Sequence, residues 1–229
     1  HEITGQEPLA PAVLQDEVPL LTPDPADIKA WVEKARTQNL SLIAAEAQAR
    51  AASEELRRRE AGHYPTLDLV ANHSYSDTTD NPINGSESEN TSIGVQLSVP
   101  IYSGGLTTAQ SREARAKLTQ AQENLEAQRR ATVREVRSAY LGVTAGISQV
   151  KARKQALSSA QTALEATQAG FEVGTRTAVD VLNAQQVRYG AQSEYFRSRY
   201  DYLLATLKLK QAAGSLSEED ITLVNGWLN

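Results

Sequence analysis

The sequence predicts a mainly helical protein with one β-hairpin, and three observations lead to this fold class. Long runs rich in Ala, Gln, Glu, Arg and Leu contain no proline, which favours long helices packed along their lengths. Aromatic residues make up only 5% of the 229 residues, so a large globular core is hard to build. Two short segments instead alternate apolar and polar residues, which is the period of a β-strand.

Composition excludes several classes of protein. The net charge of -5 and the pI of about 5.3 argue against nucleic acid as a partner. The absence of cysteine removes disulfides, thiol catalysis and thiolate metal sites. The three histidines have no metal-binding spacing, and no phosphate loop or nucleophile elbow is present. We therefore expect no enzyme, no metal and no cofactor. The chain also has no methionine and no signal-like start, so we expect it to begin inside a longer precursor.

The first part of the chain is expected to be a linker followed by a helix. Residues 1–24 contain repeated prolines and read as a linker. A helix is expected over residues 25–62, with Asp24 as its cap and Pro25 in its first position. Gly62 and Pro65 should end this helix, because both resist its continuation.

Residues 63–103 are expected to form the β-hairpin. In the second strand the aliphatic residues fall on one face and small or polar residues fall between them. These aliphatic residues are Ile93, Val95, Leu97, Val99 and Ile101. The first strand, TLDLVANHSYS, alternates less cleanly, and the polar segment DTTDNPINGSESEN joins the two. Strands of about ten residues with a long polar loop occur in outer-membrane barrels.

Two strands alone are equally compatible with a half-buried hairpin in a soluble domain. An isolated hairpin is not stable in water, and the sequence shows no further convincing strand. We therefore expect the missing strands to come from other chains or from a portion outside this sequence.

Residues 104–213 are expected to form a long helical hairpin with its tip near residues 170–176. The first helix should begin near Leu106, and its apolar residues follow a heptad seam typical of coiled-coil packing. The seam runs through Val133, Val136, Tyr140, Val143, Ile147, Val150 and Leu157, skips once to Ala160, and resumes through Leu164, Thr167 and Phe171. A second helix should run from about Thr177 to Ala213, and residues 214–229 form a terminal segment with a short helix.

Four stretches carry a resemblance to a known family. They are NLSLIAAEAQARAASEELRRREAGHYPTLDL, LSVPIYSGG, VGTRTAVDVLNAQ and RYDYLLATLKLKQAAGSLSEEDI. In this order they resemble the TolC family of outer-membrane efflux and secretion channels, and the resemblance covers nearly the whole chain. It implies that this chain corresponds to the second, C-terminal structural repeat of such a channel.

The resemblance implies a homotrimer in the outer membrane of a Gram-negative bacterium. The long helices, including residues 25–62, would then join a coiled-coil α-barrel that extends into the periplasm. The hairpin strands would contribute to one trimeric transmembrane β-barrel, with the five aliphatic residues against lipid. Tyr64 and Tyr102 would lie at the membrane interface, which suits aromatic residues. Residues 1–24 and 214–229 would be equatorial segments.

The resemblance also implies a gate at the periplasmic tip. Gly170 and Gly174 would permit the chain to reverse there. Arg176 resembles the arginine that ties neighbouring coils together, and Asp180 resembles the first pore-facing acid. Three copies of Asp180 would form a carboxylate ring that favours cations.

This sequence departs from the family pattern at two gate positions. Asn183 stands where a second pore acid is expected, and Phe171 stands where a gate tyrosine is expected. From the residues alone, Arg176 and Asp180 also fit an ordinary i,i+4 surface ion pair.

The expected function is a passive exit duct of a tripartite efflux or type I secretion system. The resemblance implies a periplasmic adaptor (membrane fusion) protein and an inner-membrane pump of the RND, MFS or ABC type as partners. The alternative is a soluble periplasmic coiled-coil adaptor or scaffold protein. An adaptor has no need for five aliphatic residues in strict alternation, so the second strand discriminates between the two.

Overall fold

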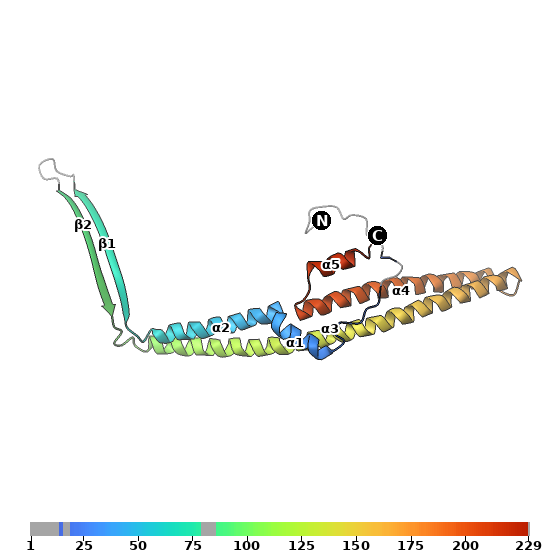
Figure 1. The fold of residues 1–229 in the computed structure, drawn as a ribbon, viewed down its shortest axis with the longest axis horizontal. Coiled ribbons are helices and arrows are strands. Elements are labelled where there is room, and N and C mark those ends of the chain that lie inside the picture. The colour runs from blue at the N-terminus through green and yellow to red at the C-terminus, as the bar shows by residue number, and fades with distance from the viewer. Residues whose placement is uncertain (1–13, 16–18, 79–85, 229) are drawn as a thin grey trace. The chain divides into compact units, whose positions relative to one another are not determined.

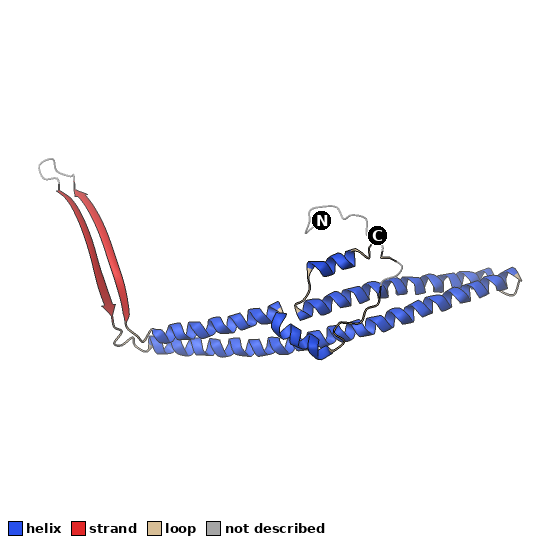
Figure 2. Ribbon diagram, in the orientation of Figure 1, coloured by secondary structure: helices blue, strands red, loops and turns tan. Residues whose placement is uncertain are grey.

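A computed structural model describes residues 14–15, 19–78 and 86–228. The elements follow in the order α1 (Ile28–Gln38), α2 (Leu40–Ala61), β1 (Thr66–Thr78), β2 (Ser86–Ser98), α3 (Leu106–Glu172), α4 (Ala178–Ala213) and α5 (Glu218–Asn225) (Figure 1). The predicted class, mainly helical with one β-hairpin, is confirmed (Figure 2). The chain divides into two units, residues 1–45 with 125–229 and residues 46–124.

The single helix predicted over residues 25–62 is wrong, because the structure divides it at Asn39. Asp27, and not Asp24, caps α1: its Oδ1 accepts a hydrogen bond from the backbone N–H of Lys29 at 2.9 Å. Asn39 has a ψ of 117°, which is extended and ends α1. Its side-chain Oδ1 accepts from the backbone N–H of Leu42 at 3.0 Å, as a helix N-cap does.

The same Asn39 side chain also serves α4. Its Nδ2 donates to the carbonyl of Ala212 at 2.9 Å, and the residue is only 8% exposed. A carbonyl in the last turn of a helix has no partner within that helix. One buried amide therefore begins α2 and satisfies the end of α4, a pairing that no local sequence pattern predicts.

The C-terminus of α4 packs closely on this break between α1 and α2. Gly214 has a φ of +71°, its N–H donates to the carbonyl of Gln211, and the N–H of Ser215 donates to Lys210, both at 2.9 Å. This is the Schellman arrangement that ends many helices at glycine. A Cβ added at Gly214 would lie 2.2 Å from the carbonyl oxygen of Gln38. Only glycine fits here.

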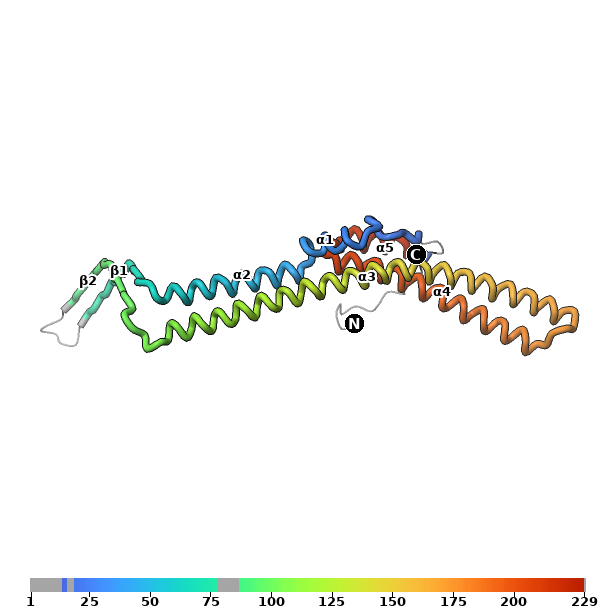
Figure 3. Tube along the Cα trace, turned by 90° about the horizontal axis from the view of Figure 1, so that it is seen from below, coloured from blue at the N-terminus to red at the C-terminus, as the bar shows by residue number. Residues whose placement is uncertain are grey.

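The core of the first unit lies between α3 and α4, which run side by side and antiparallel (Figures 1 and 3). The predicted seam is confirmed where its members are buried, at Val136, Val143, Ile147, Val150, Ala160 and Leu164. The core is completed by α1 and by the second half of α4, through Trp31, Val32, Tyr202, Leu203 and Leu209. Phe171 is 48% exposed. It lies in the last turn of α3, and α4 does not begin until Ala178, so the prediction of a seam position is wrong within this chain.

The hairpin pairs β1 with β2 antiparallel, from Thr66 opposite Ser98 to Thr78 opposite Ser86. On one face the aliphatic cross-strand pairs are Leu67 with Leu97, Leu69 with Val95 and Ala71 with Ile93. These large apolar side chains are exposed in this chain; Ile93, for example, is 74% exposed. The hairpin therefore presents an apolar face that no described residue covers.

Val99 and Ile101 were predicted as strand residues, and this is wrong because β2 ends at Ser98. The register places Pro65 opposite Val99, one step beyond the pair of Thr66 and Ser98. Proline has no backbone N–H and cannot continue the ladder. Val99 and Ile101 nevertheless remain exposed, at 58% and 94%.

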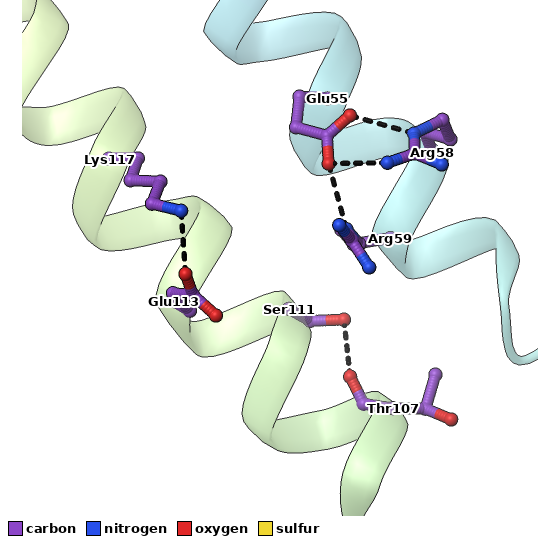
Figure 4. Close-up of polar contacts among 7 residues, drawn as sticks. All are labelled: Glu55, Arg58, Arg59, Thr107, Ser111, Glu113 and Lys117. Atoms are coloured by element: carbon purple, nitrogen blue, oxygen red, sulfur yellow. Dashed lines mark hydrogen bonds and ion pairs between the residues drawn. The ribbon is translucent and has the colours of Figure 1, made fainter.

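In the second unit, charged side chains pair within α2, and one ion pair joins α2 to the first part of α3. Figure 4 shows the contacts within α2 around Glu55. Glu55 accepts hydrogen bonds at 2.7 Å from Arg58 and from Arg59. These three bonds, the two from Arg58 before the one from Arg59, lower the pKa of Glu55 to about 2. Across the helices, Arg115 pairs with Glu60 at 3.1 Å. Because the pKa of Glu55 is depressed, its pairing persists at acid pH and is lost only near that value.

Within the first part of α3, polar contacts link residues one helical turn apart. Lys117 pairs with Glu113 at 2.6 Å, and the Ser111 hydroxyl donates to the Thr107 carbonyl at 2.9 Å (Figure 4). The Lys117 contact, followed by its charge and that of Arg59, lowers the pKa of Glu113. Arg59 of α2 therefore acts on carboxylates of both helices.

Candidate gate site at the α3–α4 turn

The turn between α3 and α4 is closed by backbone hydrogen bonds centred on Gly174. Its φ is +77°, a left-handed conformation that glycine adopts without strain. The N–H of Gly174 donates to the carbonyl of Phe171 at 3.0 Å, and the N–H of Thr175 donates to that of Gly170 at 2.8 Å. This is again a Schellman motif. Glycine at position 174 is thus required by the backbone.

Gly170 has a different role from the one predicted. It lies inside α3 and has no positive φ, so it does not reverse the chain. Its carbonyl accepts from the N–H groups of Thr175 and Arg176 and from the Thr175 hydroxyl, at 2.8, 3.1 and 2.9 Å. A Cβ at Gly170 would lie 2.8 Å from Cγ of Arg176. Glycine here makes room for the stem of Arg176.

Asp180 belongs to a capping box that begins α4. Thr177 is the N-cap, and its Oγ1 accepts from the N–H of Asp180 at 3.2 Å. Oδ2 of Asp180 accepts in return from the N–H of Thr177 at 2.9 Å and from its hydroxyl at 2.8 Å. The backbone bond first, then the hydroxyl and the charge of Arg176, lower the pKa of Asp180. The carboxylate is thus held ionised and in a fixed orientation.

The surface ion pair that we considered between Arg176 and Asp180 is not formed as a close contact in the described part of the chain. The capping box engages Oδ2 of Asp180 instead, and the guanidinium acts on Asp180 only through its charge. Sequence reasoning missed this motif, although its signal is local: Thr177 followed three residues later by an acid. The pattern recurs at Ser217 and Asp220, where α5 begins.

The structure brings together some of the predicted site residues and leaves others apart. Gly170, Gly174, Arg176 and Asp180 all meet at the turn, as described above. Phe171 and Asn183 flank it and are exposed. Tyr64, just before β1, and Tyr102, just after β2, are exposed by 69% and 88%. In the described residues no group of three or more His, Asp or Glu is arranged to hold a metal ion. No described helix is long and apolar enough to cross a membrane.

The capping box leads us to predict how the ionisation of Asp180 depends on pH. We expect Asp180 to stay ionised below the ordinary aspartate value of about 3.9. Because folding lowers this pKa, the cap is intact at any pH above the ordinary aspartate value. It is lost as the pH falls through the lower pKa that Asp180 has in the folded protein. Thr177→Val removes the hydroxyl contact and should raise the pKa of Asp180 toward the ordinary value. The measurement is infrared titration of the carboxylate band that disappears in Asp180→Asn. Identical titration curves with and without the Thr177 hydroxyl would contradict this account.

The comparisons with known proteins agree with one another. A sequence model of the family described as outer membrane efflux protein matches residues 31–215. Outer membrane protein TolC of Vibrio cholerae is 42% identical over 100% of this chain and 53% of its own length. The alkaline protease secretion protein AprF of Pseudomonas aeruginosa is 32% identical over 87% of this chain and 42% of its own.

The fold is also found among solved structures. The CmeC outer membrane channel of Campylobacter jejuni superposes with a TM-score of 0.71 at 19% identity, over 85% of this chain and 42% of that one. The chain spans about half the length of the curated relatives it matches. Because the family model matches residues 31–215 and the Vibrio cholerae relative is 42% identical along the whole of this chain, the chain belongs to the outer membrane efflux protein family.

Proposed function

We propose that this chain forms part of a passive outer-membrane channel that is gated at the α3–α4 turn. The observation that carries the proposal is the 42% identity over the whole chain to a protein named outer membrane protein TolC. The apolar hairpin face and the long helical hairpin are consistent with it. A soluble coiled-coil adaptor is not favoured, because the family match and the relatives are outer-membrane proteins.

The hairpin supports an assembled barrel. Among the described residues it is a sheet of two strands, so the outer edge of each strand is unpaired. Such edges pair readily with further strands, and strands in lipid must satisfy every backbone group by closing a barrel. We propose that other copies of the chain, as a homotrimer, supply strands to one barrel. The aliphatic pairs from Leu67–Leu97 to Ala71–Ile93 would then face outer-membrane lipid.

The long helical hairpin of α3 and α4 is consistent with a channel that extends into the periplasm. A passive duct needs partners that supply energy and direct the substrate. We propose a periplasmic adaptor protein and an inner-membrane pump in this role, in an efflux or a type I secretion system. The name of the AprF relative, an alkaline protease secretion protein, supports secretion as well as efflux. In this proposal the chain carries out no chemical reaction.

The gate proposal rests on the geometry of Asp180. The capping box engages Oδ2 of its carboxylate and leaves Oδ1 available to the pore. Symmetry would place three such carboxylates around the axis, where fixed negative charges favour cations. Arg176 comes directly before the N-cap residue Thr177, and its aliphatic stem packs against Gly170. Its guanidinium would contact a neighbouring coil.

The test uses the complete protein in a planar lipid bilayer. Asp180→Asn keeps a side-chain oxygen for the N–H of Thr177 but removes the charge, so cation preference should fall. Asn183→Asp adds an acid one turn along α4, so cation preference and block by multivalent cations should rise. Arg176→Ser should raise the open probability at similar selectivity. Reversal potential and single-channel conductance are measured. Unchanged selectivity and unchanged block in Asp180→Asn would exclude Asp180 from the constriction.

A further inference from the structure

The coil of α3 and α4 contains a thinly packed window between the core of its unit and the tip turn. On α3 no residue from 151 to 159 is buried, and on α4 none from 181 to 197 is buried. The predicted seam skips in this window, between Leu157 and Ala160. Seven residues of α4 are partly covered here. Five of them are small or polar, at Ala184, Gln185, Arg188, Ala191 and Gln192, and the other two are Val181 and Tyr195. Apolar burial therefore gives little resistance to separation of the two helices at this point.

Two polar contacts join α3 and α4 here. The pair of Arg153 and Glu194 lies within the window, and the contact of Arg188 with Gln161 lies at its edge nearer the tip, next to the buried Ala160. The partly buried Arg188 donates from Nε to Oε1 of Gln161 at 3.0 Å. Arg153 pairs with Glu194 at 3.4 Å, and both of these side chains are about half exposed. Exposed ion pairs contribute little, whereas a partly buried bond from a charged donor contributes more. The contact of Arg188 with Gln161 is therefore the stronger of the two.

The Arg188 contact is held in place on both helices. On α4 the guanidinium lies 4.8 Å from the centre of the Tyr189 ring, a cation–π geometry. On α3 Gln161 donates from Nε2 to Oε1 of Glu165 at 2.9 Å, which turns its Oε1 toward Arg188. In coiled coils, single polar contacts of this kind specify alignment where alternative apolar packings are similar in energy.

We propose that Arg188 and Gln161 are positioning residues that hold α3 and α4 together at the edge of this window nearer the tip, with Arg153 and Glu194 as a weaker second contact inside it. The tip turn then moves with the rest of the hairpin as one body. This contact would then limit how far the Asp180 carboxylate moves relative to the rest of the hairpin. That effect on ion selectivity rests on the proposed gate function.

The test is hydrogen exchange of the full-length assembled protein. Arg188→Met keeps an unbranched apolar stem and removes the donor. It should speed exchange of backbone amides in residues 153–165 and 184–194 by about tenfold. Arg197→Met, on an exposed position of the same helix, is the matched control and should change nothing. Arg188→Lys keeps a donor and should restore part of the protection. Gln161→Met removes the same contact from the α3 side and is read in the same way if Arg188→Met fails to assemble.

A second readout separates positioning from local stability. A spin label at Val173→Cys, with any cysteine elsewhere in the full-length protein replaced, reports distances between tips. Arg188→Met should broaden this distribution, and Arg188→Lys should narrow it again. Equal exchange and equal distributions in Arg188→Met and Arg197→Met would overturn the inference. Reversal potential of the unmodified protein decides the proposed channel function independently.

Discussion

Replacing Gly214 by alanine is expected to destabilise the protein by at least about 3 kcal/mol, from left-handed backbone strain together with steric overlap. Gly214 has a φ of +71°, and the new Cβ would lie 2.2 Å from the carbonyl oxygen of Gln38 and 2.7 Å from the nitrogen of Asn39. Both of these atoms belong to the backbone and cannot rotate away. The end of α4 would have to leave the break between α1 and α2, and the Asn39 bond to Ala212 would be lost with it.

The measurement is the melting temperature of the helical circular dichroism signal in detergent, for the full-length protein. The control is Gly190→Ala, in the interior of α4, where a Cβ would meet nothing within 4 Å. Alanine inside a helix is favoured over glycine by roughly 0.5–1 kcal/mol, so this variant should melt at the same temperature or higher. Similar melting of the two variants would show that the close approach at Gly214 is absent from the assembled protein.

Replacing Val95 by arginine is expected to cost about 2–4 kcal/mol of membrane stability, the cost of a cation near the middle of the bilayer on the lipid side of a barrel. Val95 pairs with Leu69 across the strands, in the central one of the three aliphatic pairs, and is 68% exposed on the apolar face. The measurement is folding of the full-length protein into lipid vesicles across a urea series.

Gln96→Arg is the matched control, one residue away on the opposite face. Gln96 lies directly opposite Asp68, so the new guanidinium gains a partner, and opposite charges across strands contribute about 0.2–1 kcal/mol. Its main effect should be on conductance. If the two variants destabilise equally, the assignment of the faces is wrong, since a shift of one residue exchanges them.

The elements of this fold follow from local patterns in the sequence, because helix and strand periods differ clearly here. The seam from Val136 to Leu164 and the alternation from Ile93 to Leu97 needed no tertiary information. The break at Asn39 did need it: the amide that makes the break is held by Ala212, far away in the sequence. The end of β2 also depended on the register, since Pro65, just before β1, cannot pair with Val99, just after β2.

The candidate site was predictable in its backbone and less so in its side chains. Gly174 could be assigned from glycine's freedom at positive φ. Gly170 was misassigned, because the need for glycine there comes from the approach of Arg176 and not from its own backbone angles. The capping box of Thr177 and Asp180 was available in the sequence and was overlooked in favour of an ion pair. The contact of Arg188 with Gln161 joins residues on separate helices, so no local pattern indicated it.

The aliphatic pairs of the hairpin occupy only the part of each strand near the helices. Beyond Ala71 and Ile93, the same face carries His73 opposite Thr91 and Tyr75 opposite Glu89, and the ladder continues to Thr78 and Ser86. At about 3.4 Å per residue this polar portion extends roughly 20 Å along the strand. In the proposed membrane orientation, these polar ends of the two strands would extend beyond the lipid on the outer side of the membrane. Antibodies raised against whole cells would then reach the strand ends directly, clear of the lipid headgroups, and this external part of the hairpin would be an epitope.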